Sequence, residues 1–304
     1  MKKYLVTGAA GFVGSALAKK LLKYDNKVVT IDNLSTGNIK NIPEGVEFIE
    51  GNVQDRKIIS SLENYKFDCI FHIAGQSSGE ISFEDPIYDL QTNTQSTLLL
   101  IELAKKINCK KIIYASTMSV YGDVNEIGSE EDFTEPKSFY GIGKLASEKY
   151  LKINSDILNC TVLRLFNIYG PGQNMNNMKQ GMVSIFLQQA LKSDQILVKG
   201  SLNRFRDFIY IDDVISAFIK AEKNNADGFK IYNIGTGIKT TVSDLLNIIC
   251  SNFHERKSII QQSNTPGDQF GIIANIDNAE KGLNWKPSYK LKDGLKKMIK
   301  YYKL

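Results

Sequence analysis

The sequence contains only two histidines, four cysteines and one tryptophan among its 304 residues. Two histidines are too few for a histidine-rich metal centre. Cys69, Cys109, Cys160 and Cys250 lie far apart and show no C-x-x-C spacing, so neither a zinc site nor a redox dithiol is predicted. We expect no bound metal, and cysteines that behave as small buried side chains in a reducing compartment.

No hydrophobic run reaches the length of a membrane span, and the N-terminal MKKYLVTG becomes polar too soon for a signal peptide. We therefore expect a cytoplasmic protein with no membrane partner. The net charge of +5 comes with scattered lysines, without the aromatic-interleaved basic block typical of nucleic-acid binding. Solvated lysine faces explain the charge better, so no nucleic-acid partner is predicted.

The length and the 42% hydrophobic content allow one large domain or two unequal domains that share a cleft. Short runs rich in Val, Ile and Phe alternate with helical patterns such as the one at residues 12–22. These runs cover residues 3–6, 27–32, 46–49, 69–73, 111–116 and 161–166. The alternation predicts an α/β fold with a doubly wound parallel sheet, of the Rossmann type, and a smaller C-terminal substrate domain.

Helical spacing and chain breaks predict the remaining organisation. Pro86 suits the first turn of a helix. Apolar residues then recur at intervals of roughly three and four, at Ile87, Leu90, Leu98, Ile101 and Ala104. A second helix is predicted at residues 138–155, and the glycines and proline of residues 169–172 break the pattern. We place the larger domain at residues 1–166, with a return around 206–236, and the smaller one mainly at 167–304.

Three glycines, Gly8, Gly11 and Gly14, follow the first predicted strand and open the first predicted helix. A lone glycine triplet would also suit a flexible loop, but this context predicts a dinucleotide site whose pyrophosphate faces the helix N-terminus. Asp32 ends the second strand, where its carboxylate can bind both hydroxyls of the adenosine ribose and would repel a 2′-phosphate. We therefore predict NAD rather than NADP.

A candidate catalytic pair, Tyr140 and Lys144, is spaced so that both side chains lie on one face of the second predicted helix. A phenol ionises near pH ~10, so a base at neutral pH needs a lower pKa, which a neighbouring ammonium and the positive nicotinamide ring would supply. Chance alone produces many Y-x-x-x-K pairs. Hydroxyl residues at the end of a predicted strand strengthen the assignment. Ser116, Thr117 and Ser119 are all candidates for the partner hydroxyl.

Seven motifs in order along nearly the whole chain resemble those of the extended short-chain dehydrogenase/reductases, and most of all the nucleotide-sugar group that is like UDP-glucose 4-epimerase. They are TGAAGFVG at 7–14, DNLSTG at 32–37, HIAGQS at 72–77, STMSVYG at 116–122, YGIGK at 140–144, RLFNIYGP at 164–171 and RDFIYIDD at 206–213. Their joint occurrence in this order is highly specific.

The resemblance implies that Tyr140 is the catalytic acid/base, that Lys144 binds the nicotinamide ribose and that Thr117 is the partner hydroxyl. Besides Tyr140 and Lys144, the cofactor-binding residues that we predict are Gly8, Gly11, Phe12, Val13, Gly14, Asp32, Asn33, Ser35, Thr36, Gly37, Asn52, Val53, Ile73, Ala74, Gly75, Gln76 and Asn93. The substrate residues that we predict are Ser77, Thr117, Ser119, Asn167, Arg206 and Asp268.

Within this set, Asn167 and Arg206 are expected on the substrate diphosphate, since an amide and a guanidinium suit phosphate oxygens. A salt bridge of Arg206 with Asp207 or Asp212 is the alternative. The family also implies a homodimer through the two long helices, although their apolar faces could instead lie wholly on the sheet.

Several positions depart from the family pattern. Asn52 replaces the usual aspartate that meets the adenine, and its amide keeps one acceptor for that contact. Gly75 and Gly143 replace a common alanine and serine, so we expect slightly looser packing there. Thr265 replaces an arginine that often precedes P-G-D and contacts the diphosphate, which weakens the case for a standard UDP-hexose.

The predicted reaction is NAD-dependent 4-epimerisation of a nucleotide-activated, UDP-hexose-like sugar in carbohydrate metabolism, such as cell-surface polysaccharide synthesis. In the family's dehydratases an Asp-Glu pair follows the catalytic threonine, whereas Met118 and Ser119 follow it here, which disfavours dehydration. A C4 dehydrogenase or 4-ketoreductase uses the same residues. A non-catalytic NAD-binding regulator is a minor alternative. The nucleotide base and the sugar stay open.

Overall fold

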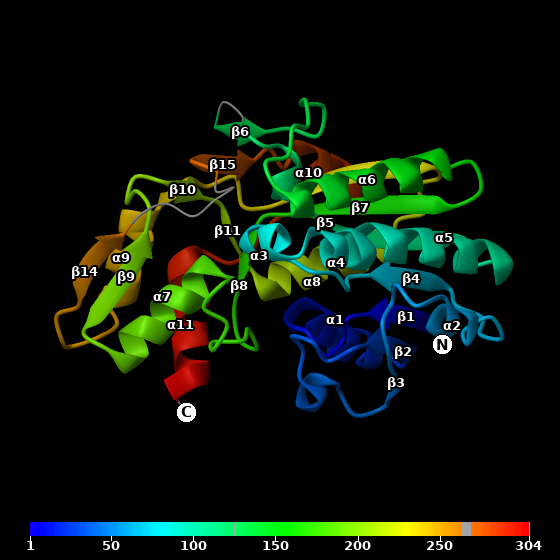
Figure 1. Cartoon of the computed structure of the whole chain (residues 1–304), viewed down its shortest axis with the longest axis horizontal. Coiled ribbons are helices and arrows are strands. Elements are labelled where there is room, and N and C mark those ends of the chain that lie inside the picture. The colour runs from blue at the N-terminus through cyan, green and yellow to red at the C-terminus, as the bar shows by residue number, and fades with distance from the viewer. Residues whose placement is uncertain (124–125, 263–268, 304) are drawn as a thin grey trace.

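The computed structural model describes residues 1–123, 126–262 and 269–303. Its centre is a seven-stranded parallel sheet in the order β12-β7-β5-β4-β1-β2-β3 (Figure 1). The strands are β1 (Lys3–Thr7), β2 (Lys27–Asp32), β3 (Val46–Glu50), β4 (Cys69–His72), β5 (Lys111–Thr117), β7 (Asn159–Leu165) and β12 (Phe229–Ile234). The strand order changes direction at β1, the point where such sheets bind ligands. The predicted doubly wound α/β fold is confirmed.

Helices cover both faces of this sheet, because successive strand residues point to opposite sides. In β1, Tyr4 and Val6 pack with α1 (Phe12–Leu22) and α8 (Ile211–Lys223). Leu5, between them, packs on the other face with α2 (Arg56–Ser60), α5 (Ser96–Lys106) and α6 (Phe139–Ile153). Both layers are mainly apolar, with a few buried polar side chains such as the paired Arg164 and Glu148. This packing fixes the strand ends that carry the polar residues described below.

The helical segment before α5 differs from the prediction. It consists of α3 (Gly79–Glu84), α4 (Pro86–Leu90) and a π-helical turn, η2 (Gln91–Gln95), which leads into α5. Pro86 does begin a helix, but the predicted apolar face is wrong in its first half, since Ile87, Leu90 and Leu98 are 65%, 54% and 36% exposed. Polar side chains of this segment are buried instead, namely Asp89, Thr92, Asn93 and Ser96.

The remaining described residues form smaller sheets and four further helices. A four-stranded sheet has the order β13-β10-β15-β6, and two strand pairs are β11-β8 and β14-β9. Their bounds are β6 (Ile127–Gly128), β8 (Asn167–Tyr169), β9 (Gln195–Lys199), β10 (Phe205–Arg206), β11 (Phe208–Tyr210), β13 (Thr240–Thr241), β14 (Ser258–Gln262) and β15 (Gly271–Ala274). The helices are α7 (Met182–Lys192), α9 (Val242–Cys250), α10 (Asp277–Leu283) and α11 (Leu291–Lys303), with single turns η1 (Ile39–Asn41) and η3 (Met118–Val120).

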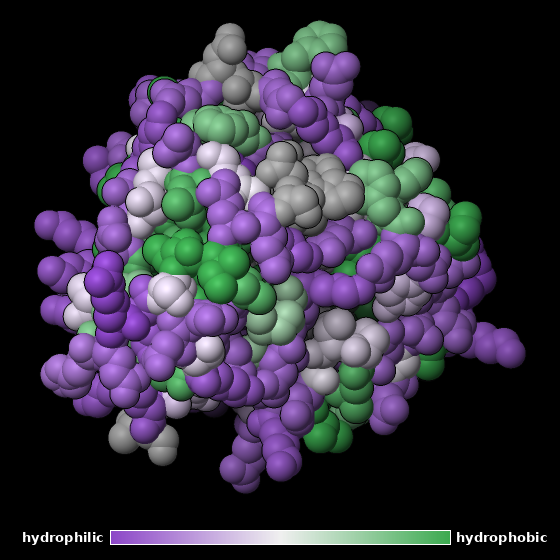
Figure 2. Space-filling model, turned by 60° about the vertical axis from the view of Figure 1, so that its left-hand side comes forward, coloured by the Kyte–Doolittle hydropathy of each residue, from purple (hydrophilic) through white to green (hydrophobic). Residues whose placement is uncertain are grey.

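The surface on the side of β9 and β14 is largely hydrophilic, with a group of hydrophobic residues among the charged ones (Figure 2). Among the residues that the structure describes, no helix is both long and apolar enough to cross a bilayer. Cys69, Cys109 and Cys160 are buried and Cys250 is partly buried, all as free thiols.

Candidate cofactor and active site

A cleft of about 990 Å³ opens at the carboxyl ends of the central strands. One wall comes from the turn after β1 and from the ends of β2, β4 and β5. The facing wall comes from the segment at 172–189 and from Lys199, Arg204 and Arg206. The cleft is therefore built between the parallel sheet and the segments that follow β8.

The turn after β1 is tight enough to require glycine. Gly8 has φ +80°, and a Cβ at this position would lie 3.0 Å from the backbone of Ala74. A Cβ at Gly14 would collide with the carbonyl of Gly8. Gly11 precedes α1 and offers no side-chain cap, so the first amides of α1 stay open toward the cleft. This cradle fits a pyrophosphate.

Asp32 is held at the end of β2 with its carboxylate already oriented. Its Oδ2 accepts a hydrogen bond from the amide of Ala10 at 2.9 Å, and its Oδ1 accepts one from Leu34 at 2.9 Å. A carboxylate oxygen has a second lone pair, so each can still accept a bond from a ribose hydroxyl. Because Asp32 lines the cleft, its position fits the adenosine half of NAD.

Most of the predicted cofactor residues line the cleft, but three do not. Asn52, Gln76 and Asn93 lie outside its lining. Asn52 is exposed, and its Oδ1 accepts a hydrogen bond from Asn33 Nδ2 at 2.7 Å, so the acceptor predicted for adenine is engaged elsewhere. An amide oxygen can accept a second hydrogen bond, so a contact of Asn52 with the adenine stays a prediction. Gln76 and Asn93 instead bind a buried carboxylate, that of Asp89.

Tyr140, Lys144 and Thr117 meet at the floor of the cleft. The first turn of α6 presents Tyr140, because the Ser138 hydroxyl caps this helix by accepting the amide of Gly141 at 3.1 Å. Lys144 lies one turn further along, with its Nζ 5.9 Å from the centre of the Tyr140 ring. All three side chains are buried by the protein and yet line the cleft. The predicted spacing on one helix face is confirmed.

The neighbours of the three hydroxyl candidates favour Thr117. Ser116 donates to the carboxylate of Glu148, which is paired with Arg164, so Ser116 is held away from the tyrosine. The Thr117 hydroxyl accepts the amide of Ser119 at 3.1 Å and lowers the pKa of the Tyr140 phenol by hydrogen bonding. Thr117, whose hydroxyl also donates to that of Ser119 at 3.2 Å, is thus the candidate that influences Tyr140, as the resemblance implies.

The protein alone does not lower the pKa of the tyrosine. Burial raises the pKa of Tyr140 to about 12, and the Thr117 hydroxyl opposes only part of this increase. Burial also lowers the pKa of Lys144 to about 8, although the nearby carboxylates of Asp89 and Glu148 act to raise it. In the chain without cofactor the pKa of the phenol therefore stays high, and its lowering by the ammonium together with the nicotinamide ring stays a prediction.

On the opposite wall, Arg206 and Asn167 line the cleft. The Arg206 guanidinium donates to the carbonyl oxygens of Phe205 and Gln269, each at 2.7 Å, and burial lowers its pKa to about 10. Asn167 Oδ1 is buried and has no hydrogen-bond partner among the described residues. The Asp207 carboxylate, the alternative partner of Arg206, accepts from the backbone amides at 236, 237 and 274. Asp268 lies outside the described residues.

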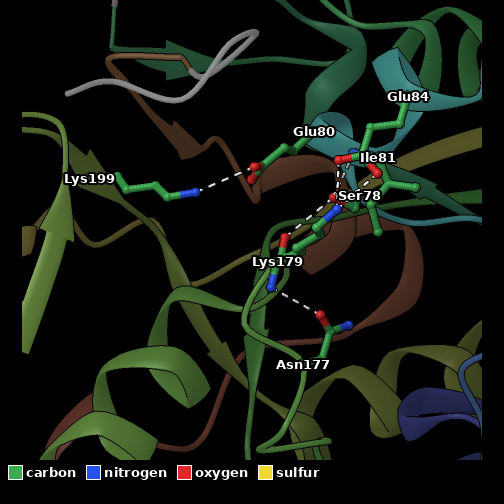
Figure 3. A network of polar contacts seen from close by, with 7 residues as sticks. All are labelled: Ser78, Glu80, Ile81, Glu84, Asn177, Lys179 and Lys199. Atoms are coloured by element: carbon green, nitrogen blue, oxygen red, sulfur yellow. Dashed lines mark hydrogen bonds and ion pairs between the residues drawn. The ribbon is translucent and has the colours of Figure 1, made fainter. Parts of the chain in front are cut away.

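Polar contacts also cross the mouth of the cleft, and we call them the rim contacts (Figure 3). Lys179 Nζ pairs with Glu84 at 2.6 Å, and Lys199 Nζ pairs with Glu80 at 3.4 Å. The Ser78 hydroxyl donates to the Lys179 carbonyl oxygen at 3.3 Å. These contacts join α3 to the segment before α7 and to β9. No sequence signal indicated them, because single lysines and glutamates occur throughout the chain.

A further rim contact involves a predicted substrate residue. Gln180 Nε2 donates to the hydroxyl of Ser77 at 2.6 Å, and both residues line the cleft. Ser77 is therefore correctly placed in the cleft, but its hydroxyl already has a partner from the opposite wall. Gln180 was missed by the sequence analysis, since its loop carries no recognisable motif.

The two glycine replacements mark close packing rather than loose packing. A Cβ at Gly75 would lie 3.3 Å from Lys144 Nζ and would collide with Asn93 Oδ1. A Cβ at Gly143 would lie 3.2 Å from Thr94 Oγ1 and 3.4 Å from Asp89 Oδ2. The expectation of looser packing is wrong, because polar side chains of α4 and η2 fill the space that a side chain would take.

Residues 4–235 match the model of the NAD dependent epimerase/dehydratase family. The chain belongs to this family. It is thus an NAD-dependent enzyme of the epimerase or a related oxidoreductase class, which confirms the predicted recognition, enzyme class and cofactor. The glycine cradle and Asp32 fit that cofactor.

Several known proteins resemble this chain along nearly its whole length. A UDP-glucose 4-epimerase of Mycolicibacterium smegmatis is 31% identical, over 98% of both chains. The crystal structure of a UDP-glucose 4-epimerase of Thermotoga maritima with UDP-glucose has a TM-score of 0.93 at 32% identity, covering 99% of this chain and 98% of that one. A UDP-glucuronic acid 4-epimerase of Bacillus cereus with UDP-glucuronic acid and NAD has a TM-score of 0.90 at 29% identity, over 99% of both chains.

Proposed function

We propose that this enzyme catalyses NAD-dependent 4-epimerisation of a UDP-hexose-like sugar through a transient 4-keto sugar. The observation that carries the proposal is the meeting of Tyr140, Thr117 and Lys144 at the floor of a cleft that begins at the Gly8 turn. Relatives of similar length that act on UDP-glucose or bind UDP-glucuronic acid support the nucleotide and the hexose.

The residues proposed to hold NAD are those of the cradle and of the floor. The open amides at the start of α1 would bind the pyrophosphate, Asp32 the adenosine ribose and Lys144 the nicotinamide ribose. When bound, NAD accepts and returns a hydride at sugar C4, and its positive ring favours the phenolate form of a nearby tyrosine. The raised pKa of Tyr140 in the protein alone makes that charge important.

Tyr140 is proposed to take the proton from the sugar hydroxyl and later to return it. Thr117 orients that hydroxyl, since its own hydroxyl already interacts with Tyr140. Lys144 is fixed by donating to the carbonyl oxygen of Ala115 at 3.0 Å, so its charge stays beside the phenol. Burial of all three groups excludes water from the proton transfer.

The cleft lacks the acids that dehydration would need, as far as its described lining extends. The carboxylates in that lining are Asp32, assigned to the ribose, and Glu80, which pairs with Lys199. Met118 and Ser119 occupy the two positions after Thr117. This supports epimerisation over water elimination, for which an acid and a base must flank the sugar.

The facing wall is proposed to bind the nucleotide diphosphate. Arg206 offers a guanidinium and Asn167 a buried amide, both in the cleft lining. We accordingly keep residues 1–166, with β12 returned to the sheet, as the NAD-binding domain and residues 167–304 as mainly the sugar-nucleotide domain. The cytoplasm is the proposed location.

A homodimer is proposed through the outer faces of α4, α5 and α6, which lie side by side (Figure 1). Large apolar side chains are exposed there, at Ile87, Leu90, Leu98, Ile142, Tyr150 and Ile153. Apolar residues exposed together on adjacent helices are typical of a protein interface. Light scattering should give a dimer mass, and Ile142→Lys should give a monomer; a monomeric parent protein would contradict the proposal.

The test of the function is an incubation of the NAD-loaded enzyme with UDP-, GDP- and dTDP-sugars, followed by NMR of the sugar ring. We expect interconversion of C4 epimers of a UDP-hexose, and no interconversion with Tyr140→Phe at equal protein concentration. NADH released in proportion to a keto sugar would instead show a dehydrogenase. Binding of NAD with no turnover of any sugar would show a regulator.

A further inference from the structure

Asp89, on α4, is a buried carboxylate that neither the cradle nor the proposed proton transfer uses. Its side chain is 1% exposed and lies outside the cleft lining. Its Oδ1 accepts hydrogen bonds from Gln76 Nε2 at 2.8 Å and from Asn93 Nδ2 at 3.1 Å, while its Oδ2 has no hydrogen-bond partner among the described residues. A buried carboxylate without an ionic partner at bonding distance costs stability, so it needs an explanation.

The carboxylate sets the direction of two amide side chains. An ionised carboxylate accepts hydrogen bonds but donates none, so each amide must turn its NH₂ group toward it. Both Gln76 and Asn93 turn their NH₂ groups toward Asp89, so their oxygens must face away from it. The Gln76 oxygen accepts the amide of Ser78, at the start of α3. The Asn93 oxygen points the other way, toward the backbone of Gly75. The Asn93 NH₂ group also donates to the Gln76 carbonyl oxygen at 2.9 Å, and the Gln76 NH₂ group to the Ser78 carbonyl oxygen at 2.7 Å. The carboxylate and these two carbonyls together determine where both amide oxygens lie.

The Asn93 oxygen and the Lys144 ammonium both lie beside Gly75, and this oxygen is buried with no hydrogen-bond partner among the described residues. A Cβ on Gly75 would lie 3.3 Å from Lys144 Nζ and would overlap Asn93 Oδ1. Gly143, the residue before Lys144, faces Asp89 directly, with its would-be Cβ 3.4 Å from Oδ2. Two glycines therefore let α4 and η2 bring Asp89 and Asn93 up to the catalytic lysine. The π-helical turn that carries Asn93 is a form often found at functional sites.

We propose that Asp89 is a positioning residue for Lys144: it turns the Asn93 amide oxygen toward the ammonium and keeps the lysine charged by its own negative charge. Asp89 touches neither NAD nor sugar in this proposal. The inference rests on the proposed function, in which Lys144 must carry a proton beside Tyr140. The proposal also explains why the charge of Asp89 is buried beside α6, the helix that carries Tyr140 and Lys144.

The electrostatics around Lys144 agree with this geometry. Burial lowers the pKa of Lys144, and the largest opposing influence is Asp89, followed by Glu148 on its own helix. Glu148 is already paired with Arg164, so Asp89 is the acid less neutralised by a cation. The other ionisable groups that face the lysine are the phenols of Tyr114 and Tyr140. The imidazole of His72, whose pKa burial and Lys144 both lower, completes this environment.

Direct titration of Lys144 in the cofactor-free protein tests the proposal without any assay of turnover. Lysine labelled with ¹³C at Cε would be followed by NMR from pH 6 to 11, and the Lys144 signal identified as the one lost in Lys144→Arg. We expect the midpoint to fall by about one pH unit in Asp89→Asn, a typical effect of removing a nearby opposite charge. The asparagine oxygen can still accept from Gln76 and Asn93, so the fold should be kept.

Asp213→Asn is the matched control. Asp213 is also a buried carboxylate, but it binds the amides of Ser288 and Tyr289, away from the cleft. It should leave the Lys144 midpoint unchanged, even if it lowers stability. An unchanged midpoint in Asp89→Asn as well would overturn the proposal. So would an equal shift in both variants, because it would show a general effect of removing a buried charge.

The pH profile of kcat/KM supplies a second, independent measurement. If the pKa of Lys144 drops by one unit from about 8, its protonated fraction falls about tenfold well above both midpoints and about twofold at pH 7. Activity should therefore fall about tenfold at high pH, about twofold at pH 7, and little below about pH 6. Asp89→Leu should lower activity at all pH values, since both amides lose their acceptor. A uniform loss in Asp89→Asn with an unshifted profile would contradict positioning through charge. If no sugar is turned over at all, the NMR titration still decides on Asp89, so the two failures can be told apart.

Discussion

The buried floor of the cleft and its rim are both polar networks, but they differ in nearly every physical respect. Tyr140 and Lys144 on the floor, and Asp89 behind it, are removed from water, and their pKa values are displaced by burial. At the rim, Lys179 and Glu84 are about half exposed and meet in solvent. Buried charges are costly unless they serve a purpose, whereas exposed pairs contribute little. We therefore expect the reaction to take place on the floor, and we expect the rim contacts to be weak contacts between the two walls.

The largest expected effect comes from the floor. Tyr140→Phe removes only the phenol oxygen, and we expect kcat to fall by roughly 10²–10⁴-fold, the usual contribution of a positioned acid or base. NAD affinity should change little, because the cradle and Asp32 are untouched. Steady-state kinetics with a fluorescence titration of NAD would measure both. An unaltered kcat would show that the floor is not the reaction centre.

Buried and exposed ion pairs offer a direct contrast in stability. Arg164 and Glu148 are 3% and 2% exposed and bond at 2.7 Å. Glu148→Gln leaves the Arg164 charge buried without its counter-charge, so the free energy of unfolding should fall by about 3 kcal/mol. Glu84→Gln, the matched change in the exposed rim pair, should leave the unfolding midpoint essentially unchanged. Equal losses in urea denaturation would refute the distinction between the two regions.

The pH dependence of stability gives a smaller effect with a definite sign. Burial raises the pKa of Asp89 to about 6, above its value in the unfolded chain. Between these two pKa values the folded state binds more protons, so this group makes the protein less stable as pH rises through about 4 to 6. Asp89→Asn lacks this ionisation and therefore this loss of stability. The free energy of unfolding of the variant, relative to that of the parent, should therefore rise by about 2 kcal/mol from pH 4 to pH 8. Thermal unfolding at both pH values measures it; a constant difference would contradict the raised pKa.

The smallest effect is expected at the rim. Lys179→Gln removes one charged contact between α3 and the segment before α7, and salt already screens such exposed pairs. We expect kcat to stay within about twofold of the parent, with a modest change in KM that disappears at high salt. A loss of kcat as large as that of Tyr140→Phe would mean that the rim takes part in the chemistry.

The sequence was sufficient for the regions where local pattern and chemistry coincide. Alternating strands and helices predicted the sheet, and the Gly8 turn and the Tyr140–Lys144 spacing predicted the cradle and the floor, because these features depend on neighbours close in the chain. The burial of Asp89 could not be predicted in this way. A π-helical turn redirects that segment, so its apolar residues point outward and its polar ones inward. The rim contacts join residues about a hundred positions apart and carry no motif.

The most direct test of the central claim is the fate of a label at sugar C4. The enzyme would be incubated in ordinary water with UDP-glucose that carries deuterium at C4, and the sugars followed by NMR. Transfer of the hydrogen away from C4 and back within one cleft predicts a C4 epimer that keeps its deuterium. A C4 epimer that has lost the deuterium to solvent, or the absence of any C4 epimer, would contradict the account.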